Sequence, residues 1–187
     1  LTAEHPELEL ELVAEPRHLS LMRREVDLAL RPSRFEDDDV VQRKLATIAF
    51  GLYASEAYLA RYGQPDFARR CEGHRLIAMS AGLTKIPDLE WLPPLTGKSF
   101  ISVRSNGREA MATLASAGVG IACLPRLIGD RSPRLRLLRP PGAAPERPLW
   151  LGVHRDLRGL PRVRATITFL AAAFERARAA LAPEPSA

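Results

Sequence analysis

Ala117–Pro125, the stretch AGVGIACLP, decides the fold class. It follows a helical pattern that begins at Asn106, and Gly118 is the residue type most often found just past a helix C-terminus. Val119 to Leu124 is a tight apolar run, typical of a strand covered on both faces, and Pro125 ends it. A helix that leads through one glycine into a buried strand predicts an α/β domain.

Patterns of both kinds alternate along the rest of the chain. Leu8, Leu10 and Leu12 alternate with glutamates, as in a half-buried strand, whereas apolar residues after Pro161 recur every three or four positions, as on one helix face. We predict strands at 8–14, 26–30, 48–54, 76–79, 100–103, 119–124, 135–138 and 149–153, and helices at 19–25, 55–62, 66–72, 106–117 and from 161 onwards. This order predicts a mainly parallel sheet with helices on both faces.

Composition excludes several classes of protein. The chain has 187 residues, of which 46% are hydrophobic, so it has enough apolar side chains for a real core and is neither disordered nor collagen-like. No apolar stretch approaches the roughly 20 residues of a membrane helix, and the chain as given shows no secretory signal. Cys71 and Cys123 are the only cysteines, which favours a reduced, cytoplasmic protein over a disulfide scaffold.

The charge is basic, but its distribution does not predict nucleic-acid binding by this segment. The formal net charge is +5, and a basic balance raises that hypothesis. The arginines are spread along the whole chain, however, and form no long run. Direct DNA contact by these residues is therefore the less favoured interpretation.

Motifs that carry chemistry are absent from the sequence. The four histidines are scattered and neither cysteine lies in a CxxC pair, so we expect no metal and no cofactor. There is no GxSxG nucleophile motif. Gly118-Val119-Gly120 continues to Cys123 instead of a third glycine and precedes a strand, the reverse of a dinucleotide-binding turn. Asp37-Asp38-Asp39 is best explained as a solvated loop. We expect no catalytic residues and no enzyme.

Two irregular stretches predict a division into lobes. Residues 69–74 and 139–148 look like two passages of the chain from one lobe to another. We predict a discontinuous first lobe at 1–70 and 149–182, a second lobe at 71–148, and a frayed tail at 183–187. A chain that leaves one lobe, builds a second and returns forms a cleft in which small ligands bind.

Four stretches, in this order and spacing, resemble the effector-binding domain of LysR-type transcriptional regulators. They are HPELELEL at 5–12, REVDLALR at 24–31, LYASEAYL at 52–59 with GQP at 63–65, and AGVGIACLP at 117–125. The sequence PRVR at 161–164, leading into the final helix, also resembles that family. The resemblance covers nearly the whole chain.

The resemblance implies a fold and a function. It implies an α/β, two-lobe fold of the type 2 periplasmic-binding-protein kind, with two crossovers and an inter-lobe cleft. Such domains sense small, often anionic metabolites and associate into homodimers or homotetramers. Compared with the family pattern, we expect the DNA-binding winged helix-turn-helix to be absent from this chain and the first strand of lobe I to be missing as well. We therefore expect contact with DNA only through that absent domain, and no membrane contact.

The resemblance also implies which residues bind the effector. Arg17, Arg31, Ser80, and Asn106 with Gly107 match family positions in loops at strand ends. An arginine fork and the N-terminus of a helix both suit a carboxylate. Each residue has a structural explanation too: Asn106 as a helix cap, Ser80 as a turn, and the two arginines as solvated groups or partners of the Asp37–Asp39 loop.

Three rival classes make different demands. A solute-binding protein of a transport system, the main alternative, requires an export signal. A small α/β enzyme, the less favoured alternative, requires a convergent nucleophile or acid–base pair. A module that only dimerises would fill its cleft with its own side chains.

Overall fold

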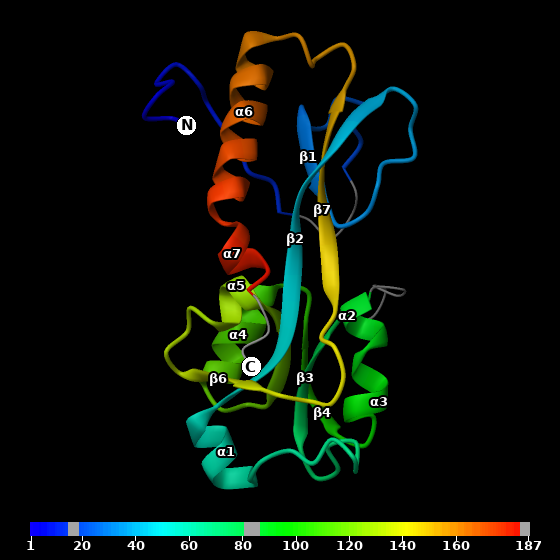
Figure 1. Cartoon of the computed structure of the whole chain (residues 1–187), viewed down its shortest axis with the longest axis vertical. Helices are drawn as coiled ribbons and strands as arrows, with labels where there is room; N and C mark the ends of the chain where they lie inside the picture. The colour runs from blue at the N-terminus through cyan, green and yellow to red at the C-terminus, as the bar shows by residue number, and fades with distance from the viewer. Residues whose placement is uncertain (15–18, 81–86, 184–187) are drawn as a thin grey trace. The chain divides into compact units, whose positions relative to one another are not determined.

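The computed structural model describes residues 1–14, 19–80 and 87–183 (Figure 1). Its strands are β1 (Leu28–Arg31), β2 (Val40–Ser55), β3 (Arg75–Met79), β4 (Phe100–Ser105), β5 (Ile121–Pro125), β6 (Leu135–Leu138) and β7 (Glu146–His154). Its helices are α1 (Glu56–Tyr62), α2 (Pro87–Glu90), α3 (Leu92–Thr96), α4 (Arg108–Ser116), α5 (Arg126–Gly129), α6 (Pro161–Arg176) and α7 (Arg178–Leu181).

Packing divides the chain into two compact units. The first comprises Leu1–Thr47 and Pro148–Ala179, and the second comprises Ile48–Arg147 and Ala180–Ala187. The chain therefore passes from the first unit to the second within β2 and returns at Arg147–Pro148, within β7. The predicted lobe bounds, with passages at 69–74 and 139–148, stay predictions. The ligand cleft expected between lobes stays a prediction.

The sheet of the second unit is mixed, not mainly parallel as predicted. Its strands follow the order β2-β5-β3-β4, with β6 also paired to β2. β3 is parallel to both β4 and β5, but β2 runs antiparallel to β5 and β6. The prediction failed because strand β2 enters this unit in the opposite direction, which the order of elements along the chain does not reveal.

Helices cover both faces of this sheet, as predicted. Along β3, Leu76 and Ala78 pack in one hydrophobic cluster and Ile77 and Met79 in another, because successive strand side chains point to opposite faces. The first cluster includes Tyr58 of α1 and two leucines of α3, and the second includes Met111 and Ala115 of α4. β5 is divided in the same way, so it is buried on both faces.

Helix α1 coincides with the helix predicted at 55–62. The Ser55 side chain accepts a hydrogen bond from the Tyr58 N–H at 3.2 Å, which satisfies one of the free amides at the helix start. Gly63 ends the helix with φ +78°, a conformation that suits glycine, and its N–H donates to the Leu59 carbonyl.

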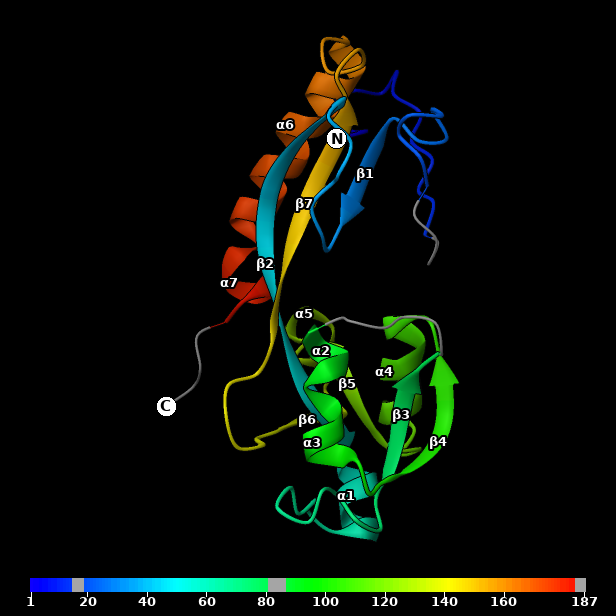
Figure 2. The same cartoon turned by 90° about the vertical axis from the view of Figure 1, so that its right-hand side faces the viewer.

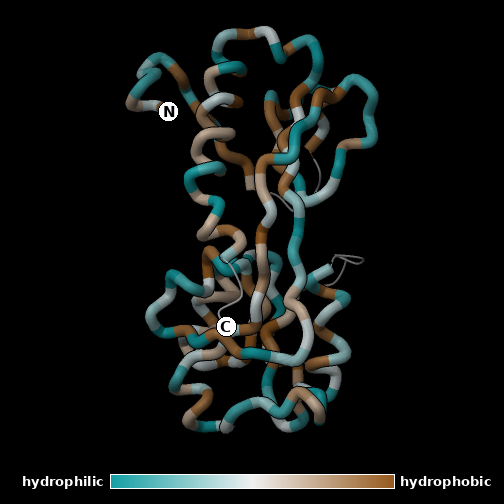
Figure 3. The backbone as a smooth tube through the Cα atoms, in the orientation of Figure 1, coloured by the Kyte–Doolittle hydropathy of each residue, from teal (hydrophilic) through white to brown (hydrophobic). Residues whose placement is uncertain are grey.

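The first unit contains a smaller sheet with α6 packed on it (Figure 2). β1 pairs antiparallel with β7, and β7 neighbours β2. Val163 and Ile167 of α6 pack against Val153 of β7 and Leu28 of β1. The tube of α6 alternates between hydrophobic and hydrophilic colours along its length, as the predicted amphipathic stripe requires (Figure 3).

Three local predictions were wrong. Residues 8–14 form no strand, and Leu12 is 92% exposed, because no neighbouring strand pairs with this segment among the described residues. Residues 19–25 and 66–72 form hydrogen-bonded turns instead of helices, and the second turn holds Arg70 and Cys71 at positive φ. The short helices α2 and α3 lie between the predicted strands 76–79 and 100–103, where no element was predicted.

Gly152 of β7 provides a test of packing in the first unit. A Cβ added there would lie 2.4 Å from the ring of Phe35, which is buried in a small cluster with Leu21 and Val40. We expect Gly152→Ala to lower the free energy of unfolding by about 1–3 kcal/mol, because the ring must move within a filled core. Urea denaturation measures this change.

Gly159→Ala is the matched control for that substitution. No atom lies within 4 Å of the added Cβ at this position, so its effect should stay within about 0.5 kcal/mol. Equal stabilities of the two variants would show that Phe35 does not lie against Gly152.

A buried tyrosine–histidine pair joins α1 to β3. The Arg75 N–H donates to the Tyr58 hydroxyl at 2.8 Å, so the hydroxyl hydrogen is free to be donated to Nδ1 of His74 at 3.1 Å. That arrangement needs a neutral imidazole. Burial lowers the pKa of His74, although an interaction with the Gln64 backbone raises it by less.

The His74 pair predicts a pH dependence of stability. Because the pKa of His74 is lower in the folded chain, the unfolded chain binds the proton more tightly, and stability is lost as pH falls below about 6.5. Above that pH the residue has no such effect. One proton corresponds to a slope of at most about 1.4 kcal/mol per pH unit. Urea midpoints between pH 7 and pH 5 should fall more steeply for the natural chain than for His74→Gln, and parallel curves would contradict the account.

Candidate functional site

Two of the predicted effector-binding segments meet at one edge of the second unit. Met79 and Ser105 are paired at the carboxyl ends of the parallel strands β3 and β4, so Ser80 and Asn106 are the residues that follow these ends. The Ser80 N–H donates to the Ser105 carbonyl at 3.0 Å. In open α/β sheets, ligands bind outside the carboxyl ends of the strands.

Gly107, not Asn106, is the N-cap of α4. It has extended backbone angles and makes no side-chain cap, and Ser105 Oγ accepts a hydrogen bond from its N–H at 3.2 Å. The predicted capping role of Asn106 was wrong because the helix begins two residues after it, at Arg108. The Asn106 side chain is exposed at the strand ends.

The two predicted arginines belong to other parts of the chain. Arg31, in β1 of the first unit, donates from Nη2 to the Leu19 carbonyl at 2.5 Å, and its guanidinium lies 4.6 Å from the centre of the Phe35 ring. Arg31 thus has a structural partner, but not the acidic loop considered from sequence. Arg17 lies outside the described residues.

A buried ionic cluster that the sequence analysis missed lies beside this edge. The Asp88 side chain, in α2, is fully buried between Arg108, the first residue of α4, and Arg147 of β7. Arg147 Nη1 donates to Asp88 Oδ1 at 3.0 Å, while Arg108 binds Oδ2. Arg108 also donates to the Cys123 carbonyl at 2.6 Å. We call Asp88, Arg108 and Arg147 the arginine–aspartate cluster.

The arginine–aspartate cluster is nearly dry. Both arginine side chains are 14% exposed, and both guanidinium groups lie over the ring of Phe50, 5.3 and 5.6 Å from its centre. Burial lowers the pKa of Arg147, with the Asp88 carboxylate opposing the shift. Nothing in the sequence brings residues 88, 108 and 147 together, since they are at least 20 positions apart and belong to three elements.

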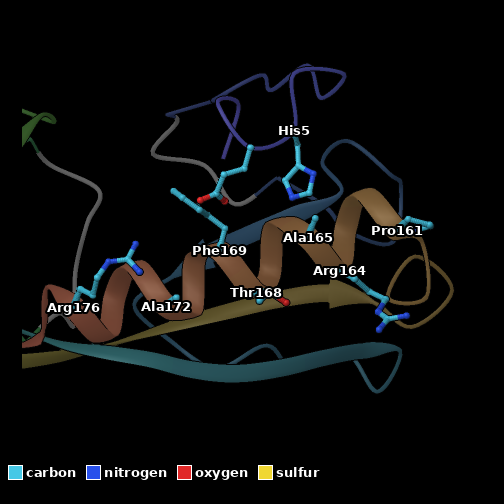
Figure 4. Close-up of a pocket in the computed structure, with 9 residues that line it drawn as sticks. His5, Pro161, Arg164, Ala165, Thr168, Phe169, Ala172 and Arg176 are labelled. Atoms are coloured by element: carbon cyan, nitrogen blue, oxygen red, sulfur yellow. The ribbon is translucent and has the colours of Figure 1, made fainter.

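A different groove lies in the first unit, between α6 and the N-terminal segment (Figure 4). The volume of this groove is about 570 Å³. His5 points toward the helix above Ala165. Arg176 lies at one end of the groove, and Phe169 and Thr168 line its middle. The groove contains none of the predicted effector-binding residues.

A metal-binding cluster does not form within residues 1–14, 19–80 and 87–183. In these ranges no three His, Cys, Asp or Glu side chains gather closely enough to hold a metal ion. Cys71 and Cys123 are free and fully buried. Burial raises the pKa of the Cys71 thiol to about 11 and that of Cys123 to about 12, so neither is a ready nucleophile.

The sequence of residues 1–175 matches the family of the LysR substrate binding domain. The chain belongs to this family. Relatives of this LysR substrate-binding domain include the HTH-type transcriptional regulator CrgA of Neisseria meningitidis, 31% identical over 130 residues that span 67% of the chain and 42% of CrgA. An HTH-type transcriptional regulator of Haemophilus influenzae is 30% identical over 135 residues, 70% of the chain and 46% of that protein.

Solved structures of regulatory domains share the fold of this LysR substrate-binding domain. The regulatory domain of CrgA from Neisseria meningitidis has a TM-score of 0.76 and 23% identity, over 92% of this chain and 87% of that one. The regulatory domain of AphB from Vibrio vulnificus has a TM-score of 0.72 and 20% identity, with the same coverage. The predicted fold class is therefore confirmed, as is the family that the sequence resembled.

This LysR substrate-binding domain spans less than half the length of the two relatives named above. Its described helices are all too short or too polar to cross a membrane.

Burial of the thiols predicts their reactivity. At pH 8, Cys71 and Cys123 should react with an aromatic disulfide reagent only as fast as the domain opens, because both are buried and their thiolates are scarce. Absorbance should show two reactive thiols per chain in denaturant and almost none in native buffer. Rapid labelling of either thiol in the native domain would contradict the burial described here.

Proposed function

We propose that this domain senses a small organic anion and passes that signal to DNA through a winged helix-turn-helix elsewhere in the full-length regulator. The observation that carries the proposal is the match of residues 1–175 to the LysR substrate-binding domain family. The related proteins CrgA and its Haemophilus influenzae counterpart are named transcriptional regulators. The domain itself performs no chemistry in this proposal.

Effector-binding residues in the proposal are those at the strand ends. Ser80, Asn106 and Gly107 supply hydroxyl, amide and backbone donors at one edge of the second unit. Arg31 of the first unit, together with Arg17, supplies guanidinium groups that can hold a carboxylate in two parallel hydrogen bonds. That these residues contact one ligand is a prediction of the proposal.

Signalling follows from a shift between the populations of two arrangements of the domain. A ligand favours the arrangement of the domain that it binds more tightly, and by no more than the difference between its two affinities. The arrangement so favoured changes the contacts in a homodimer or homotetramer and thereby the spacing of the DNA-binding heads. A protein that acts on DNA in this way works in the cytoplasm.

Calorimetric titration of the full-length regulator with a panel of small mono- and dicarboxylic acids tests the proposal. At least one acid should bind with a measurable heat, and Arg31→Ala combined with Asn106→Ala should weaken it by at least about tenfold, since hydrogen bonds to charged groups contribute about 1.5–3 kcal/mol each. Arg43→Ala, at an exposed position of β2, is the matched control and should bind normally.

Other outcomes of that titration would favour the rival classes. Absence of binding by any acid would leave a module that only dimerises. Turnover of a panel member would indicate a small α/β enzyme. Export of the full-length protein from the cell would favour a solute-binding protein of a transport system over a regulator.

A further inference from the structure

The arginine–aspartate cluster carries more positive than negative charge. Asp88 contributes one carboxylate, while Arg108 and Arg147 contribute two guanidinium groups, so one positive charge has no counterpart within the cluster. Arginines are seldom buried to this extent unless they are paired, because removing a charge from water is costly. The surplus charge therefore favours binding of one further negative group.

The free donors of Arg147 define the shape of that group. Its Nη1 donates to Asp88, and its Nε and Nη2 make no hydrogen bond to the described residues. Nε and Nη2 lie along one side of the guanidinium plane, and this edge holds a carboxylate in two parallel hydrogen bonds. Arg108, by contrast, uses both of its terminal nitrogens, on Cys123 and Asp88.

The setting of Arg147 strengthens such a contact. Phe50 lies against both guanidinium groups and keeps water from one side, and the 14% of the side chain that stays exposed leaves a way in from solvent. Hydrogen bonds between charged groups are stronger in such a partly dry place than in water. Arg108 follows Gly107 directly, so the cluster adjoins the strand-end residues already described.

We propose that the Nε–Nη2 edge of Arg147 is a binding site for a single carboxylate group, held by the charge that Asp88 leaves uncompensated. This inference deepens the proposed function, on which it rests for its biological meaning, because it assigns to the effector one carboxylate and to Arg147 the role of holding it. Asp88 is a positioning residue: it fixes the plane of both guanidinium groups and sets the net charge of the site.

Acetate titration, followed by NMR through the Nε–Hε signal of Arg147, tests the inference in the natural chain. The signal is assigned by its absence in Arg147→Gln. Acetate should shift it in a saturable way, and sodium chloride at the same ionic strength should not, since a spherical ion cannot occupy both donors of the edge at once with good geometry. Equal saturation by chloride would overturn the carboxylate assignment.

Three variants separate the site from a merely structural cluster. Asp88→Asn raises the formal charge of the cluster, so acetate should bind about tenfold more tightly, while the fold should lose stability. Arg147→Lys keeps the charge but removes the planar edge, so acetate should bind at least about tenfold more weakly. The backbone amide signals of residues 105–108 measure this affinity in both proteins. Arg61→Gln, at an exposed position of α1, should leave the response unchanged.

One outcome of the acetate titrations would overturn the inference. Backbone shifts that are the same in the natural chain and in Arg147→Lys would mean that acetate binds elsewhere or only loosely. Because the probe is acetate and not the effector, such a result would remove this carboxylate site while leaving the calorimetric test of the full-length regulator untouched.

Discussion

Burial of strands β3 and β5 on both faces is the constraint on which the second unit depends. Ile77 and Leu124 pack toward α4, and Leu76 and Cys123 pack toward α1 and α3, so no strand face is left for water. Backbone polar groups in such strands must pair within the sheet, and this fixes the register in which Met79 lies beside Ser105. The loops at the strand ends therefore come together through packing of the core and need no contacts of their own.

The packed sheet of the second unit also supports the arginine–aspartate cluster. A buried carboxylate is costly unless it is paired and hydrogen-bonded, and Asp88 is held on both oxygens by side chains from two further elements, α4 and β7. The cluster thereby ties the short helix α2, which has a single turn, to the start of α4. Charge and rigidity are supplied together at the edge where small ligands are expected.

Local signals predicted what depends on local chemistry. Ser55 caps the start of α1, Gly63 ends it, and Pro161 begins α6, because caps and turns are decided by neighbouring residues. The alternating leucines at 8–12 failed for the opposite reason: their pattern needs a partner strand, and none pairs with them among the described residues. Strand directions, the Asp88 contacts and the proximity of Ser80 to Ser105 depend on residues far apart in sequence, so only the structure gives them.

The central claim is that this LysR substrate-binding domain holds its ligand at the carboxyl ends of β3 and β4. A crystal structure of the full-length regulator grown with a carboxylic acid selected by calorimetry tests it most directly. The account predicts density for the acid beside Asn106 and Gly107, with its carboxylate on the free edge of Arg147. Density in the groove along α6 instead, with the strand ends empty, would contradict it.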